Sequence, residues 1–208
     1  MTDQGVDESK RATLRRFAAL GTAGSFARFA GAGSAESDDE SDARAAIAGY
    51  LEATPGAHFS KIRDDLQLGT GETQHHLRQL LEDGRVESYK DGEYRRFVPA
   101  ERFDDFEKTA LSYLRRETPR GMVLTLLEDT DATGGDIAEV VGVSRPTVSK
   151  CAAELESAGL LTRESGYTLV APERVLLLVV RYADSFGPDA VALAENAADL
   201  VTMAGRDQ

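Results

Sequence analysis

The sequence predicts a mainly α-helical protein with small β-hairpins, in which one supersecondary unit occurs twice. Two observations carry this prediction: a pattern of apolar residues that recurs at a fixed distance, and turn residues at the same places in both copies. The chain has 208 residues, enough for two or three small domains, and 41% of them are hydrophobic, so each domain can bury a core.

The repeat comprises eight residue pairs that share one spacing without a gap, the two members of each pair lying 75 residues apart. The pairs are Ile62 and Ile137, Leu66 and Val141, Leu68 and Val143, Thr73 and Val148, Leu77 and Ala152, Leu80 and Leu155, Gly84 and Gly159, and Val86 and Leu161. Chance matches two or three positions in an alanine-rich chain, but not eight in register with a shared glycine. The unit is therefore present twice.

The second copy reads as two helices joined by a tight turn and followed by a hairpin. Thr133 and Asp136 form a capping box before the first helix, and Gly142 supplies the turn. Ser144 caps the second helix, which Gly159 ends. The strands of the hairpin are expected at residues 160–164 and 167–170.

The first copy has the same order. Its helices are expected at residues 60–66 and 70–83, and its strands at residues 85–89 and 93–98. Asp91-Gly92 lies between these strands and is a strong hairpin signal. A further helix precedes each copy, at residues 43–53 and 119–128. Helix, helix, tight turn, helix and hairpin make a winged helix-turn-helix domain, so the sequence predicts two tandem winged helix-turn-helix domains plus C-terminal helices.

Two stretches resemble known regulators. GVSRPTVSKCAAELESAGLL resembles the recognition-helix segment of MarR- and ArsR-type transcription regulators, and PGAHFSKIRDDLQLGTGETQHHLRQLLEDGRV resembles the archaeal winged-helix form of that segment. The whole chain resembles a tandem winged-helix regulator of haloarchaea. The resemblance implies sequence-specific binding to double-stranded DNA, regulation of transcription, a cytoplasmic location and no enzymatic activity.

The acidic composition fits this resemblance. Asp and Glu number 36 against 24 Lys and Arg, for a formal net charge of −12. Such a charge normally opposes binding to a polyanion, but at molar salt the Debye length falls to roughly 3 Å and only close contacts count. Arg outnumbers Lys 19 to 5, and an acidic, Lys-poor surface is typical of halophilic archaea.

Other functional classes find little support. One cysteine and three histidines leave no material for a disulfide framework or a multi-cysteine metal site, and no motif for catalysis or cofactor binding is present. No run approaches the ~20 apolar residues that a membrane span requires. His76 and Cys151 occupy equivalent positions and are interpreted as structural; a redox role for Cys151 would need a resolving cysteine that the chain lacks.

The domain organisation follows from the repeat. We expect a flexible tail at residues 1–41, winged domains at 42–100 and 118–171, a linker helix at 101–117, and C-terminal helices at 172–208. The apolar run Val175–Val180 and the stripe of the final helix indicate a homodimer interface in the C-terminal part. The alternative is that these helices fold back on the linker helix.

The expected tail, residues 1–41, allows three interpretations. Arg15-Arg16 followed by an Ala- and Gly-rich run resembles a twin-arginine export signal. The segment departs from that pattern because Phe17 directly follows the arginine pair and Arg28 interrupts the run. We therefore favour a cytoplasmic tail over an export signal or a surface anchor.

The second helix of each motif is the expected DNA-reading element. In the second copy, Arg145, Ser149 and Lys150 should face outward while Val148 and Ala152 face the core. The candidate DNA-binding residues of this copy are Ser144, Arg145, Thr147, Ser149, Lys150 and Arg163. Those of the first copy are Thr70, Gln74, His75, Arg78, Lys90, Arg95 and Arg96, the last three in a basic cluster at the hairpin tip together with Arg85.

The first copy is less clearly a DNA reader. Glu72 would either accept a hydrogen bond from a cytosine or repel phosphate, and residues 59–98 contain seven basic and eight acidic residues. This balance keeps an alternative open: an interaction or architectural module whose winged helices bind the transcription machinery, or bind DNA non-specifically.

Overall fold

The computed structural model describes residues 13–17 and 35–204, and the chain divides after Phe103 into two compact units. Both units are mainly helical with small antiparallel hairpins, which confirms the predicted fold class. Within the described ranges, no helix has both the length and the apolar character needed to cross a membrane.

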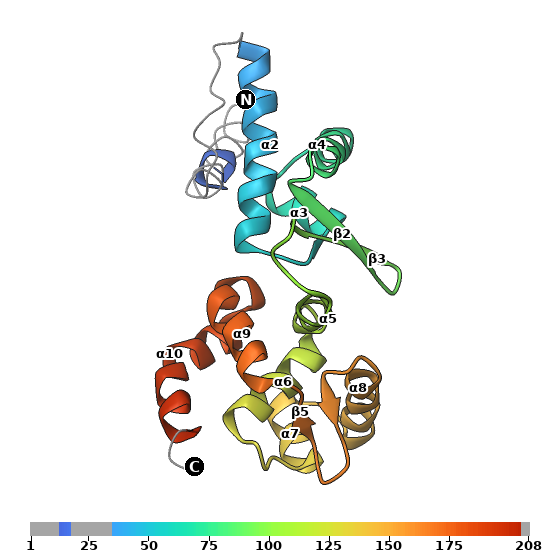
Figure 1. Ribbon diagram of the computed structural model, residues 1–208, viewed down its shortest axis with the longest axis vertical. Helices are drawn as coiled ribbons and strands as arrows, with labels where there is room; N and C mark the ends of the chain where they lie inside the picture. The colour runs from blue at the N-terminus through green and yellow to red at the C-terminus, as the bar shows by residue number, and fades with distance from the viewer. Residues whose placement is uncertain (1–12, 18–34, 205–208) are drawn as a thin grey trace, which may run out of the picture. The chain divides into compact units, whose positions relative to one another are not determined.

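The first unit has a helical core covered by a small sheet (Figure 1). Its elements are α2 (Ala35–Ala53), β1 (Ala57–His58), α3 (Phe59–Asp65), α4 (Thr70–Glu82), β2 (Val86–Asp91) and β3 (Tyr94–Pro99). The strands lie in the order β1-β3-β2, all antiparallel. Ile47, Leu51, Ile62 and Leu80 are fully buried at the centre.

Two features of this unit differ from the prediction. Strand β1 was not expected, because two residues carry no readable alternation; Ala57 pairs with Phe97 and His58 with Arg96. Helix α2 begins at Ala35, eight residues before the expected start at Ala43. The added turns are rich in Asp and Glu, which are favourable near a helix N-terminus.

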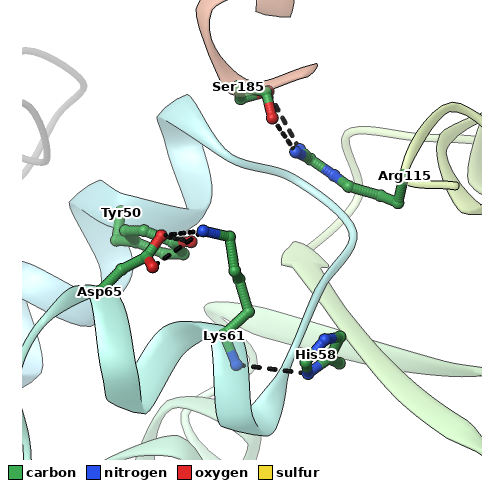
Figure 2. A network of polar contacts seen from close by, with 6 residues as sticks. All are labelled: Tyr50, His58, Lys61, Asp65, Arg115 and Ser185. Carbon is green, nitrogen blue, oxygen red and sulfur yellow. Dashed lines mark hydrogen bonds and ion pairs between the residues drawn. The ribbon is translucent and has the colours of Figure 1, made fainter. Parts of the chain in front are cut away.

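A polar network fixes α3 against α2 (Figure 2). The hydroxyl of Tyr50 and the ammonium of Lys61 both donate to the carboxylate of Asp65, each at 2.8 Å. His58 caps α3 by accepting from the backbone N–H of Lys61 through Nδ1, at 3.2 Å. Burial lowers the pKa of His58, and the nearby charges of Arg96 and Lys61 lower it further. The imidazole is therefore kept in the neutral form that can act as an acceptor.

Part of the predicted tail belongs to the core of the first unit. Residues 13–17 are helical; Leu14 is only 3% exposed and Phe17 packs edge-on against Tyr50, with 5.3 Å between ring centroids. Arg15 and Arg16 are exposed. The rest of the segment that resembles an export signal lies outside the described residues.

The second unit contains the other copy of the motif and the C-terminal helices (Figure 1). Its elements are α5 (Asp105–Leu114), α6 (Glu117–Glu128), α7 (Gly134–Val141), α8 (Arg145–Ser157), β4 (Leu161–Thr162), β5 (Thr168–Leu169), α9 (Pro172–Phe186) and α10 (Pro188–Ala204). The capping box of Thr133 and Asp136, the left-handed turn at Gly142 and the cap at Ser144 are as predicted. The hairpin is shorter than expected, with only two cross-strand pairs.

The C-terminal helices pack within their own unit, α9 on α5 and α10 on α6. Arg115 of the linker segment donates to the backbone carbonyl of Ser185 at 2.6 Å (Figure 2), and its guanidinium lies 4.6 Å from the ring centroid of Phe186. Arg174 of α9 pairs with Asp104 and Glu107 of the segment that opens α5. Most of the apolar face of α9 is therefore buried within the same chain, as expected if the helix folds back on the linker helix.

We expect the substitution Arg115→Met to lower the free energy of unfolding by about 1–3 kcal/mol, because it removes charge-assisted hydrogen bonds that dock α9. The matched control is Arg181→Met, at an exposed position of α9. Urea denaturation followed by circular dichroism measures both variants. Equal stability of the two variants would show that Arg115 does not dock α9.

Candidate nucleic-acid interface

The two faces of α8 are sharply different. Val148, Ala152 and Leu155 are at most 1% exposed and pack toward α6 and α7. Arg145, Ser149 and Lys150 are exposed. The structure thus confirms which side of the helix faces the core and which faces solvent.

The first turn of α8 carries a cluster of hydrogen-bonding groups. The hydroxyl of Ser144 accepts from the backbone N–H of Thr147 at 3.3 Å, and the two hydroxyls lie 2.8 Å apart. Pro146 stands in the first turn, where its missing N–H has no helical acceptor to satisfy. Ser144 and Thr147 remain exposed, so their hydroxyls are accessible to a ligand.

Arg145 lies beside the start of α7. A Cβ atom placed on Gly135 would come within 3.0 Å of Nη2 of Arg145, so the glycine leaves room for the guanidinium. The pKa of Asp136 is lowered mainly by the hydrogen bond from the hydroxyl of Thr133, with a smaller contribution from the charge of Arg145. Arg145 makes no hydrogen bond or ion pair with any other residue that the structure describes, so its donors can serve a ligand.

The second hairpin is tied to both helices of the motif. Arg163 donates through Nε to the carboxylate of Glu156 at 2.8 Å, which joins the strand end to the last turns of α8. Tyr167 packs over Gly134, where an added Cβ would meet its ring at 3.2 Å. Sequence reasoning did not identify Gly134, Gly135 or Tyr167; two consecutive glycines in the first turn of a helix were the available signal.

In the first unit, α4 exposes the predicted residues Thr70, Gln74, His75 and Arg78. Glu72 is different: its carboxylate accepts from the backbone N–H of Gly69 at 3.0 Å and caps its own helix. It is half-buried. The carboxylate thus has a structural role at the start of α4, and whether it also meets DNA stays a prediction.

The basic cluster at the first hairpin is smaller than predicted. Lys90 and Arg95 are exposed, but Arg96 is only 4% exposed. Its Nε lies 2.5 Å from the carboxylate of Asp91, and Nη1 donates to the backbone carbonyl of Gly56 at 2.9 Å. Successive side chains of a strand point to opposite faces, so Arg95 and Arg96 cannot share one surface. Arg96 is a structural residue, which corrects its placement at the hairpin tip.

The remaining ionisable candidates are buried. His76 and Cys151, at equivalent positions of α4 and α8, are 3% and 5% exposed, which supports their structural interpretation. Burial raises the pKa of the Cys151 thiol to about 11, and the charge of Glu154 adds to the increase. Among the residues that the structure describes, no three His, Cys, Asp or Glu side chains are grouped to hold a metal ion.

Comparison with known families identifies both motifs. Residues 41–111 match a family described as an N-terminal HTH (helix-turn-helix) domain, and residues 110–176 match the Crp-like helix-turn-helix domain. The chain therefore carries two tandem helix-turn-helix domains, as the sequence predicted. The finer resemblance to MarR- and ArsR-type regulators stays a prediction.

Comparisons with curated proteins and with solved structures do not extend this assignment. No curated protein matches the chain significantly. Among solved structures, the DIP2311 protein from Corynebacterium diphtheriae is 18% identical, with a TM-score of 0.25. The similarity covers 65% of this chain and 27% of that protein. At this level it indicates neither fold nor function.

We expect Cys151 to react slowly with a thiol reagent in the native protein, because a pKa of about 11 leaves roughly one thiol in a thousand ionised at pH 8. The measurement is labelling by iodoacetamide, followed by mass spectrometry, with the urea-unfolded protein as the reference. The raised pKa also means that the protonated thiol stabilises the fold below pH ~8.5, and this contribution is lost as the pH rises toward 11. Native labelling as fast as in urea would show that the thiol is accessible and ionised.

Proposed function

We propose that this protein is a non-enzymatic transcription regulator that binds a specific sequence of double-stranded DNA, chiefly through α8. The observation that carries the proposal is the two-sided character of that helix, whose apolar face is fixed in a helix-turn-helix core while its first turns present polar side chains to solvent. The two helix-turn-helix families that the chain matches support it.

The exposed residues of α8 suit the two kinds of contact that such a helix makes. Arg145 can donate two hydrogen bonds to O6 and N7 of guanine, a pairing that discriminates bases in the major groove. Ser144, Thr147, Ser149 and Lys150 can contact phosphates or base edges. Arg163 is held on the second hairpin by Glu156, at a place where a wing reaches the DNA backbone.

The first domain contributes more weakly in this proposal. Thr70, Gln74, His75 and Arg78 line the exposed face of α4, and Lys90 and Arg95 can contact phosphate from the hairpin. Arg96 is left out because it is buried and paired with Asp91. If this domain instead docks to transcription machinery, removal of Lys90 and Arg95 should leave the affinity for DNA unchanged.

The net charge of −12 fits this function at high salt concentration. Long-range repulsion from DNA is then screened, and affinity depends on the close contacts of residues such as Arg145 and Lys150. We propose that the protein works in the salt-rich cytoplasm of a haloarchaeal cell, in agreement with the composition of the chain.

We propose further that the active form is a homodimer. Leu177 and Val180 are large apolar residues that remain 69% and 41% exposed on α9, on the side that the fold-back of the helix leaves uncovered. A two-fold dimer would place two copies of α8 about 34 Å apart, one turn of DNA, and so double the base contacts.

The sequence preference is tested by selecting sites from a random duplex pool at the working salt. We expect enrichment of one short, dyad-symmetric site. The substitution Arg145→Ala should weaken binding to that site by about 1–3 kcal/mol and relax the preference at one base pair. Fluorescence anisotropy with the selected site and its single-base variants measures both effects.

The matched control is Arg181→Ala, which removes an exposed arginine from α9. It should bind like the unmodified protein. A pool without enrichment would indicate non-specific binding, and an unchanged base preference in Arg145→Ala would contradict the role of this residue.

We expect light scattering at high salt to give a mass near twice 22.4 kDa at micromolar concentration. The double substitution Leu177→Glu and Val180→Glu should convert the dimer to a monomer, because it places charge in the apolar contact. A single-chain mass for the unmodified protein would refute the dimer.

A further inference from the structure

A cavity lies between the recognition helix and the hairpin of the first domain. Its volume is about 550 Å³, within the range of small-molecule sites. The floor is apolar, formed by Phe59, Leu77, Leu81 and Phe97. These four side chains come from α3, α4 and β3, so the cavity follows from the packing of three elements and not from one loop.

The rim of the cavity is mostly cationic. Arg78 and Arg95 both line it, against one carboxylate, that of Glu82. Arg95 is held in place, because its Nε donates to the hydroxyl of Ser88 at 2.8 Å and its guanidinium lies 5.5 Å from the ring centroid of Phe97. Arg78 makes no hydrogen bond or ion pair with another described residue. Thr70 and Gln74, from the same helix as Arg78, add hydrogen-bonding groups to the lining.

The second domain fills the equivalent corner differently. There Glu156 of α8 is joined to Arg163 of the hairpin by an ion pair that bridges helix and strand. In the first domain, the residues equivalent to Glu156 and Arg163 lie 75 positions earlier and are Leu81 and Ser88. These two residues cannot form an ion pair: Leu81 is part of the apolar floor, and the hydroxyl of Ser88 accepts a hydrogen bond from Arg95. The two copies of one fold thus differ at the place where the first copy has a cavity.

From these observations we infer that the first domain binds a small organic anion, an apolar ring system or chain that carries one carboxylate or sulfonate group. The apolar body lies on the phenylalanine and leucine floor, and the anionic group accepts hydrogen bonds from Arg78 beside Arg95. An uncharged apolar molecule would leave Arg78 without an anionic partner, and a small inorganic anion would leave the apolar floor exposed to water.

Such a ligand would occupy the side of α4 on which Gln74 and Arg78 lie, residues that the proposed function assigns to DNA contact. Ligand and DNA would then exclude each other at the first domain. The inference about the ligand itself does not depend on the proposed function, since the cavity belongs to the protein alone.

The test uses two fluorescent probes that share their aromatic rings: anilinonaphthalene sulfonate, an anion, and phenylnaphthylamine, its neutral analogue. Titration of the full-length protein without DNA should show saturable binding of the anion and much weaker binding of the neutral probe. The substitution Arg78→Gln should weaken binding of the anion about tenfold and leave the neutral probe unaffected.

Lys90→Gln is the matched control, since it removes one exposed positive charge outside the cavity and should change neither titration. Gln74→Phe places an aromatic ring in the cavity and should abolish binding of the anion. Unchanged binding of the anion in Arg78→Gln or in Gln74→Phe would overturn the inference, as would equal binding of the two probes. Because no DNA is present, these outcomes are independent of the proposed regulatory function.

Discussion

The packing of α8 is the constraint on which the second domain depends. In a domain of this size, a helix of 13 residues buries one face in the core. The residues on that face therefore determine which of the other positions are exposed. With Val148, Ala152 and Leu155 buried, the rotation of the helix is fixed. The burial of Cys151 and the exposure of Arg145 both follow from that rotation. The same geometry that keeps the thiol protonated therefore directs the arginine toward solvent.

The two copies show how one scaffold supports different surfaces. Their core positions match, because each must fill the same space between three short helices and a hairpin. Their surface positions are free to differ: Thr70 stands where the second copy has Arg145, and Leu81 where it has Glu156. The core thus accounts for the common fold, while the surface residues account for the separate roles proposed for the two domains.

Sequence reasoning succeeded where the determinants are local and failed where they depend on partners distant in the chain. The turn at Gly142 and the cap at Ser144 could be predicted because the atoms that satisfy each helix end lie within a few residues. The placement of Arg96 could not, because it depends on the carbonyl of Gly56, 40 residues away. Strand alternation could have separated Arg95 from Arg96, which were expected in one cluster, but it does not indicate which of the two is buried. Similarly, the apolar run of α9 predicted a covered helix, but not that α5 of the same chain would cover it.

The burial of Arg96 also has a dynamic consequence. Arg96 pairs with Asp91 of the hairpin and donates to Gly56, the residue that precedes β1, and six pairs join β2 to β3. The hairpin of the second domain has two such pairs. The backbone of the first hairpin is therefore held by more cross-strand hydrogen bonds than that of the second, and it has less conformational entropy left to lose when it forms a contact. In the proposed complex with DNA, this difference would make the first wing the more selective of the two for the shape of the surface that it contacts.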